Sequence, residues 1–295
     1  MGLKVTKSPL TNADYGIRLS SANSFYRGRS SIQGDFSLKT RAKLRVERKI
    51  RLDLIGQLIK HHHSSQLNDK EIFFTYSFPL VTSHENGMAR IIHQQEQITY
   101  PFRIPLGVNL PPSCELKDFS VVYYLDIYHD EKFLPNSRKK ITLAPPAPRV
   151  NIPPPCTNTD PSGITTTCHL QKSFYSAREG SIVPLTISIE NLQSNRIHSL
   201  TIQLVQTVLL NEITHENEIF TTLFDEIELN LHENRIETIV ELTLPSNLSS
   251  TYVPDKNCQP DNVPLVSITY EFRLTKQIDD INNSNVYLPI PIGIE

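Results

Sequence analysis

The sequence predicts an all-β protein made of two tandem antiparallel β-sandwiches of immunoglobulin-like type, and three observations support this. Short segments alternate apolar and polar residues with a period of two, which is the period of a β-strand. Long helical periodicity is almost absent, so no alternation of helices and strands is expected. A proline-rich segment near the middle divides the 295 residues into halves that are each the size of a domain.

The longest alternating pattern covers residues 32–54. Its even positions are mostly apolar, whereas every odd position from Lys39 to Asp53 is charged. This pattern predicts two strands joined by a turn near residues 40–45. Shorter alternating segments, bounded by Pro, Asn, Gly or Ser, predict further strands at residues 73–78, 121–128, 183–189, 200–209, 236–244, 266–274 and 286–292.

The proline-rich segment at residues 144–163 is interpreted as a stiff connector, because proline cannot donate to a sheet ladder. We therefore expect four parts along the chain. They are a leader at 1–14, a first β-sandwich at 15–144, a linker at 145–165 and a second β-sandwich at 166–295.

The two halves repeat one plan. In the first half, Phe25-Tyr26-Arg27-Gly28 precedes an alternating strand that begins at Ile32. In the second half, Phe174-Tyr175 and Gly180 precede a strand that begins at Ile182. The turn glycines are expected to supply positive φ.

Four stretches, which together span roughly residues 15–294, contain short motifs that can be compared with known families. The first is a turn with an aromatic residue and a glycine that leads into an Ile-x-Gly strand. The second combines a Pro-Phe strand, a loop and a tyrosine strand. They are Tyr26–Gly34; Tyr100–Pro105 with Leu110–Ser113 and Val121–Leu125; Phe174–Gln206; and Leu288–Gly293. In these stretches the sequence resembles the arrestin family, most closely the arrestin-domain-containing proteins called alpha-arrestins.

The resemblance implies a cytosolic adaptor that binds membrane receptors or transporters and links them to endocytic trafficking or ubiquitylation machinery. Recruitment of a ubiquitin ligase is in doubt, because none of the Pro-Pro pairs is followed by the tyrosine of a Pro-Pro-x-Tyr motif. Two alternatives stay open. One is a retromer-type endosomal cargo-sorting subunit of the same fold, and the other is a structural immunoglobulin-like binding module.

Basic residues are concentrated in the first 60 residues, which contain 13 Lys and Arg against 4 Asp and Glu. If one strand ran through them, the residues from Lys39 to Arg45 would stack on one face at intervals of about 6–7 Å. Such a face suits phosphorylated or acidic protein tails, or anionic lipid. A solvated strand face is the alternative. The candidate anion- and cargo-binding residues are Lys39, Arg41, Lys43, Arg45, Arg48, Lys49 and Arg51.

The N-terminus has no apolar run of signal-peptide length, and Gly2 with Thr6 fits the N-myristoylation pattern. A cytoplasmic protein is therefore expected, with peripheral association with the plasma membrane or endosomes left open. A disordered leader is the alternative reading of Gly2. In a reducing compartment the cysteines are expected to be free thiols; they are Cys114, Cys156, Cys168 and Cys258.

No catalytic signature is present, and we expect neither an enzyme nor a cofactor. Three consecutive histidines, His61–His63, point to alternate sides of a strand and are not expected to hold a metal. Nucleic acid is not an expected partner, because no aromatic residues interleave the basic segment and the chain carries a net charge of −2.

Overall fold

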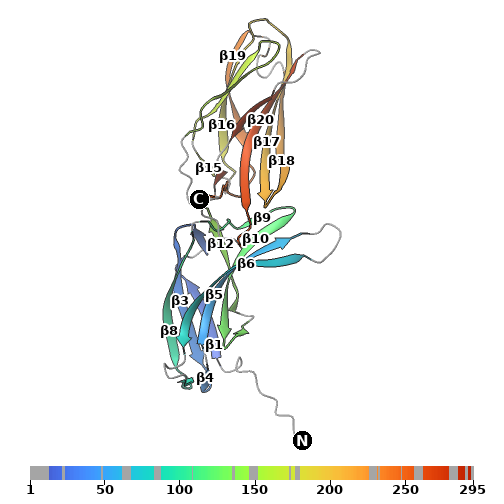
Figure 1. Ribbon diagram of the computed structural model, residues 1–295. Coiled ribbons are helices and arrows are strands. Elements are labelled where there is room, and N and C mark those ends of the chain that lie inside the picture. Colours follow the sequence, from blue (N-terminus) through green and yellow to red (C-terminus); the bar gives the residue numbers. More distant parts are fainter. Residues whose placement is uncertain are drawn as a thin grey trace. The chain divides into compact units, whose positions relative to one another are not determined.

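The computed structural model describes residues 13–21, 24–47, 49–61, 68–82, 88–107, 109–134, 137–145, 152–172, 174–176, 180–225, 231, 233–246, 248–255, 262–278, 285–289 and 292–293. The chain forms two compact units (Figure 1). Unit 1 is Met1–Pro146 with Cys258–Val263, and unit 2 is Ala147–Asn257 with Pro264–Glu295.

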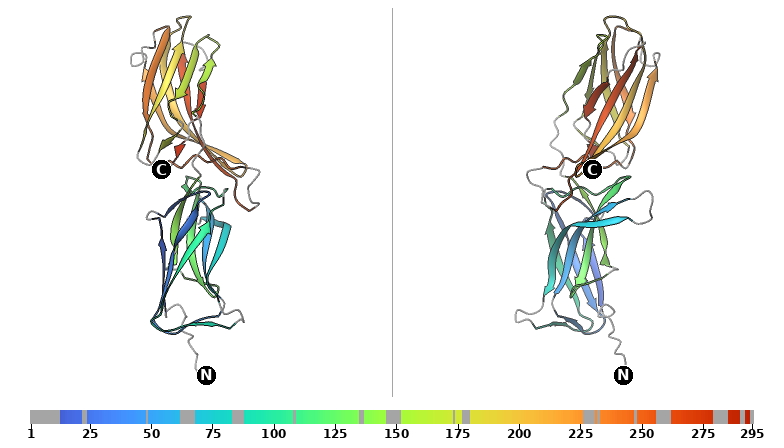
Figure 2. Two further views of the ribbon diagram at one scale, coloured as in Figure 1. Left: turned by 90° about the vertical axis from the view of Figure 1, so that its left-hand side faces the viewer. Right: turned by 45° about the vertical axis from the view of Figure 1, so that its right-hand side comes forward.

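Unit 1 is built from two sheets and a short ribbon (Figure 2). Its strands are β1 (Ala13–Leu19), β2 (Phe25–Arg27), β3 (Ser31–Thr40), β4 (Leu44–Val46), β5 (Lys49–Lys60), β6 (Asp69–Thr82), β7 (Arg90–Ile92), β8 (Gln97–Pro105), β9 (Cys114–Glu115), β10 (Phe119–His129), β11 (Lys132–Phe133) and β12 (Lys139–Ala144). One sheet has the order β1-β3-β8, and the other has the order β2-β12-β10-β5-β6, with β9 and β11 also paired to β10. β4 and β7 pair with each other in the ribbon.

The core of unit 1 contains the inward side chains of the alternating segments. Phe36 and Leu38 of β3 are fully buried, as are Leu52 and Leu54 of β5. Gly34, the glycine of the Ile-x-Gly motif, has a steric role, because a Cβ there would lie 2.3 Å from the carbonyl oxygen of Arg18. The motif therefore reflects the close approach of β1 and β3.

Unit 2 is a second sandwich of two four-stranded sheets. Its strands are β13 (Cys156–Thr159), β14 (Thr165–Leu170), β15 (Tyr175–Ser176), β16 (Ile182–Glu190), β17 (Ile197–Leu210), β18 (Ile213–Asp225), β19 (Arg235–Thr243), β20 (Val266–Ile278), β21 (Asn285–Pro289) and β22 (Ile292–Gly293). The sheets have the orders β13-β14-β16-β19 and β18-β17-β20-β21, and β15 pairs in parallel with β22.

A buried ion pair fastens the first hairpin of unit 2 to the opposite sheet. Lys276 of β20 is completely buried, and its Nζ lies 3.0 Å from Oδ2 of Asp160, in the turn between β13 and β14. Oδ1 of Asp160 accepts a hydrogen bond from the backbone N–H of Ile164 at 3.0 Å. Burial lowers the pKa of Lys276, and hydrogen bonding and charge attraction from Asp160 oppose that effect.

The predicted fold class is confirmed, since both units are all-β in their described parts. The predicted linker at 145–165 is wrong from Cys156 onward, because β13 and the buried Ile164 belong to the second sandwich. No proline lies between Pro155 and Pro161, so this short stretch keeps the N–H groups that a ladder needs. β1 begins at Ala13, two residues before the predicted start.

Within the described residues, no helix has the length and apolarity needed to cross a membrane.

Candidate functional site

The basic segment does not form one continuous strand face. The predicted turn near 40–45 is present, because β3 ends at Thr40 and β4 begins at Leu44. The N–H and C=O groups of Thr40 both bond to the turn before β8, through Glu96 and Gln95 at 3.0 Å each. The chain then passes through β4 into β5, which lies in the other sheet. Even spacing of Lys39, Arg41, Lys43 and Arg45 along one strand is therefore wrong.

Arg41 and Arg45 are each paired with a carboxylate that lies close by. Arg41 binds Asp14 through two hydrogen bonds, from Nε at 3.0 Å and from Nη2 at 2.5 Å. The hydrogen bond from Arg41 holds the pKa of Asp14 below its ordinary value, and the charge of Lys39, its register partner, acts in the same direction. Arg45 Nε lies 3.7 Å from Glu47 Oε1. Lys43 is exposed and forms no ion pair with any described residue.

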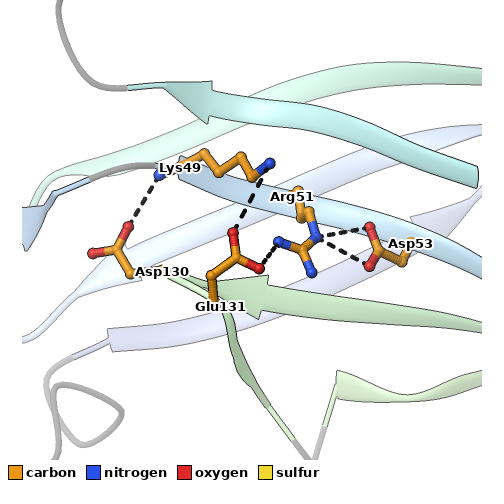
Figure 3. A network of polar contacts seen from close by, with 5 residues as sticks. All are labelled: Lys49, Arg51, Asp53, Asp130 and Glu131. Carbon is orange, nitrogen blue, oxygen red and sulfur yellow. Dashed lines mark hydrogen bonds and ion pairs between the residues drawn. The ribbon is translucent and has the colours of Figure 1, made fainter. Parts of the chain in front are cut away.

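Arg51 and Lys49 belong to a polar network on β5 and the turn after β10 (Figure 3). Arg51 Nε donates to both carboxylate oxygens of Asp53, at 3.1 and 3.0 Å, and its Nη1 bonds to Glu131. Lys49 Nζ lies 3.9 Å from Glu131. The Asp130 carboxylate accepts the backbone N–H of Lys49 at 3.0 Å. These contacts hold the sheet and the turn together, so they leave Arg51 little capacity for a ligand.

Arg48 and Gly2 lie outside the described residues, as do His62 and His63. His61 Nε2 is 2.8 Å from the hydroxyl of Ser120. Among the described residues, no group of three or more His, Cys, Asp or Glu side chains is arranged to hold a metal ion.

A second basic site lies at the opposite end of β3, where two arginines that are distant in the sequence come together. Arg29 is in the turn between β2 and β3, and Arg103 is on β8, with Gln33 as its register partner. Together with neighbouring residues they line an open pocket of about 710 Å³, which we call the Arg29–Arg103 pocket. Its lining residues are Arg29, Ser30, Ser31, Gln33, Arg103, Pro105 and Leu106.

Ser31 connects two of the other residues that line this pocket, Gln33 and Arg103. Its hydroxyl oxygen accepts hydrogen bonds from Arg103 Nε at 3.1 Å and from Gln33 Nε2 at 2.9 Å. In the described part of the chain, no carboxylate pairs with Arg29 or Arg103. The pocket therefore presents two guanidinium groups whose charge is not neutralised locally, which is the arrangement that binds a phosphate or carboxylate group.

Arg29 occupies a backbone conformation that arginine rarely adopts. Its φ is +66°, in the left-handed region, and the turn is closed by a hydrogen bond from Ser30 N to Arg27 O at 3.1 Å. A left-handed residue with a Cβ costs about 1–2 kcal/mol. Glycine was expected to supply the positive φ of such turns; it does so in the second half, where Gly180 has φ +66°. Strained residues are enriched at functional sites, which agrees with a binding role for Arg29.

Sequence reasoning missed the Arg29–Arg103 pocket, because its two arginines are separated by more than 70 residues. The sequence alone could show only that Arg29, Ser31 and Gln33 are spaced by two residues, which would place them on the same side of an extended chain. Pairing β3 with β8 was needed to place Arg103 beside them.

The fold and the sites thus define an all-β protein of two tandem sandwiches, whose clearest candidate site is a pocket lined by two arginines. Residues 161–294 match the family model described as "Arrestin (or S-antigen), C-terminal domain". This match covers most of the second sandwich, which is therefore similar to the C-terminal domain of arrestins, a family of non-enzymatic adaptors. A search of curated proteins found no significant match to the sequence.

Proposed function

We propose that this protein is an adaptor that binds phosphorylated or acidic segments of membrane receptors or transporters and links them to endocytic trafficking or ubiquitylation machinery. The Arg29–Arg103 pocket is the observation that supports the binding step. The link to trafficking rests on the similarity of the second domain to the arrestin C-terminal domain. The absence of a Pro-Pro-x-Tyr motif argues against direct recruitment of a ligase by this sequence.

The pocket suits a phosphorylated side chain for a chemical reason. A guanidinium group can donate two parallel hydrogen bonds to the oxygens of a phosphate, and such charge-assisted bonds are roughly twice as strong as neutral ones. Ser31 fixes Arg103 Nε, so the Nη atoms of that arginine stay available. The basic segment contributes less, because Arg41, Arg45 and Arg51 are engaged with carboxylates.

Fluorescence anisotropy with a labelled phosphoserine peptide tests this proposal. The double variant Arg29→Gln/Arg103→Gln removes both charges and should weaken binding at least about tenfold, since each hydrogen bond to a charged group contributes about 1.5–3 kcal/mol. The matched control is Lys70→Gln/Lys132→Gln, which removes two exposed charges from β6 and β11, in the other sheet of the same unit. Equal affinity of the parent and the pocket variant at low salt would contradict the proposal.

The same peptide without its phosphate separates the two ligand chemistries. If the pocket recognises the phosphate, removing the phosphate from the peptide should weaken binding to the parent protein. The loss should be at least as large as the loss caused by Arg29→Gln/Arg103→Gln with the phosphopeptide. Affinity for the phosphopeptide should also fall as salt rises from 50 to 200 mM, because exposed charges are screened over about 8–10 Å.

A further inference from the structure

Two cysteines of unit 2 lie directly opposite each other on neighbouring strands. Cys156 of β13 is the register partner of Cys168 of β14. The next pair along the ladder is Thr157 and Thr167, whose hydroxyl oxygens are 3.0 Å apart on the exposed side of the hairpin. Because successive side chains of a strand point to opposite faces, both cysteine side chains leave the hairpin on its inner side. The two thiols therefore face each other.

The spacing of the two strands at this point suits a disulfide. Asp160 N donates to Ile164 O at 3.1 Å, at the turn end of the same ladder. Hydrogen-bonded and non-hydrogen-bonded pairs alternate along antiparallel strands, so Cys156 and Cys168, four residues further along each strand, form a hydrogen-bonded pair. The Cα atoms of such a pair are about 5.5 Å apart, within the range of about 4.4–6.8 Å found in disulfides. The Cβ atoms must approach each other by about 1 Å before the bond can close.

The two thiols differ in their exposure to solvent. Cys168 is only 1% exposed, whereas Cys156 is partly exposed. Burial raises the pKa of Cys168 to about 12, a negative charge on Cys156 acts in the same direction, and the positive charge of Lys276 opposes both. Oxidation of a thiol follows its exposure and its thiolate character. An oxidant in solution therefore reaches Cys156 first, and Cys168 lies next to it as a second thiol.

We infer that Cys156 and Cys168 form a reversible disulfide when the protein meets hydrogen peroxide, so that the hairpin of β13 and β14 is sensitive to oxidation. The thiolate of Cys156 attacks one peroxide oxygen and becomes a sulfenic acid, while hydroxide leaves. The sulfur of Cys168 then attacks the sulfenic sulfur, and the S–S bond forms. The sulfenic oxygen leaves as water and takes the proton of Cys168. Overall the two thiols lose two electrons and two protons, and hydrogen peroxide is reduced to two molecules of water.

The geometry favours a bond that is easily reduced again. A disulfide that is held away from its preferred geometry is more reducible, and strained disulfides are the labile, regulatory ones. β13 has four residues and lies at the edge of its sheet, so it can shift by the small distance that the bond requires. With a reductant present, both cysteines stay thiols, and only the oxidant converts them.

The disulfide would act on the strand where the proline-rich segment enters unit 2, since Pro155 directly precedes Cys156. The ion pair of Asp160 with Lys276 holds the turn end of the hairpin. The cysteines lie at the other end, where an edge strand of this length opens easily. Oxidation should therefore stabilise β13 against local opening. This inference does not rest on the proposed peptide binding, because the Arg29–Arg103 pocket belongs to unit 1.

Peptide mapping after peroxide treatment tests the inference on the full chain. Trypsin releases both cysteines in one peptide, residues 150–172, because no Lys or Arg lies between Arg149 and Lys172. Hydrogen peroxide in small excess, removed afterwards with catalase, should lower the mass of this peptide by two hydrogen atoms and block its alkylation. Reduced glutathione should restore both the mass and the alkylation.

Single variants assign the role of each thiol. Cys168→Ser should leave Cys156 as a sulfenic acid that dimedone traps, because no second thiol faces it. Cys156→Ser should leave Cys168 unmodified, because Cys168 is buried. The matched control is Cys114→Ser, which removes a buried cysteine of unit 1 and should form the disulfide as the parent does.

Hydrogen exchange measures the effect on the strand. In the oxidised parent, the amides of β13 should exchange at least about tenfold more slowly than in the reduced parent, because a cross-link restricts the opened chain. In Cys156→Ser, peroxide should leave their exchange unchanged.

Three results would overturn the inference. They are a peptide 150–172 in which peroxide produces sulfinic acid at Cys156 while Cys168 stays a thiol, a disulfide that joins Cys156 to Cys114 or to Cys258, and a bond that persists in excess reduced glutathione. The last result would make the bond a structural disulfide instead of a reversible one. Arg29→Gln/Arg103→Gln should form the disulfide as the parent does, whether or not it has lost phosphopeptide binding.

Discussion

Asp53 and Asp126 lie directly opposite each other on β5 and β10, and each carboxylate is held by its own arginine. Asp53 is 3% exposed and bonds to Arg51, whereas Asp126 is fully buried and accepts two hydrogen bonds from Arg138, at 2.9 and 2.6 Å. Like charges directly opposite on a sheet repel each other. The two arginines offset that repulsion, which gives Arg51 a structural role in the sheet.

Replacing Arg138 with Met should destabilise unit 1 by about 3 kcal/mol, because it leaves the fully buried Asp126 charge without its partner. Methionine keeps apolar bulk over Tyr124, whose ring centre is 4.7 Å from the guanidinium carbon. Urea unfolding measures the change. Arg45→Met is the control, and its loss should stay below about 0.5 kcal/mol, because its ion pair is exposed. Similar losses for both variants would contradict the structural role of Arg138.

The sequence could predict which side of residues 32–54 faces the core, because period two fixes that side wherever one face is buried. Leu38, Leu44 and Ile50 are 0%, 1% and 0% exposed. The charged side was less predictable. Whether an arginine is available to a ligand depends on carboxylates that tertiary structure brings to it, such as Asp14 for Arg41, which is 27 residues away.

The end of the linker was also placed wrongly, because a short strand lies between the prolines. Prolines at 153–155 and 161 indicate a connector, but the four residues of β13 between them are long enough to pair with β14. Short strands of this length carry too little periodicity to be recognised without their partners.

Replacing Lys276 with Met should destabilise unit 2 by about 3–5 kcal/mol, since Asp160 would stay buried and charged without its partner. The double variant Lys276→Met/Asp160→Asn should recover a large part of that loss. Asparagine is uncharged, and its side-chain oxygen can still accept the N–H of Ile164. Chemical unfolding of the two single variants and the double variant measures the coupling. Additive losses would show that the ion pair is unimportant.

His129 should make unit 1 less stable as pH falls from about 7 to 5. Burial lowers its pKa below the ordinary value of 6.5, so the unfolded chain takes up a proton before the folded chain does. The stability from the neutral ring is therefore complete above pH 6.5 and declines below it, by at most about 1.4 kcal/mol per pH unit. His129→Asn, which can still accept from Tyr15, should flatten this decline. The exposed-site control His93→Asn should not, and thermal unfolding at pH 7.5 and 5.5 measures both.

Cys156 should react with iodoacetamide before Cys114 and Cys168. Burial raises the pKa of Cys114 and of Cys168 to about 12, so at pH 8 about one in ten thousand of these thiols is ionised. Cys156 is only partly buried. Mass spectrometry of tryptic peptides after timed labelling gives the order, and protein unfolded in urea should label at all sites alike. Recovery of a stoichiometric disulfide would refute the expectation of free thiols.

Replacing Arg29 with Gly should separate stability from binding at the pocket. Glycine adopts the φ of +66° without the steric cost that a Cβ imposes, although its greater freedom in the unfolded chain offsets part of that gain. We therefore expect the free energy of unfolding to rise by as much as about 1 kcal/mol, while phosphopeptide affinity falls. Urea unfolding and fluorescence anisotropy measure the two quantities. Arg103→Gly is the informative comparison, because Arg103 lies within β8, where glycine weakens a strand, so it should lose both stability and affinity. If Arg29→Gly destabilised the protein, the strain at this turn would not be the cost of keeping an arginine in the pocket.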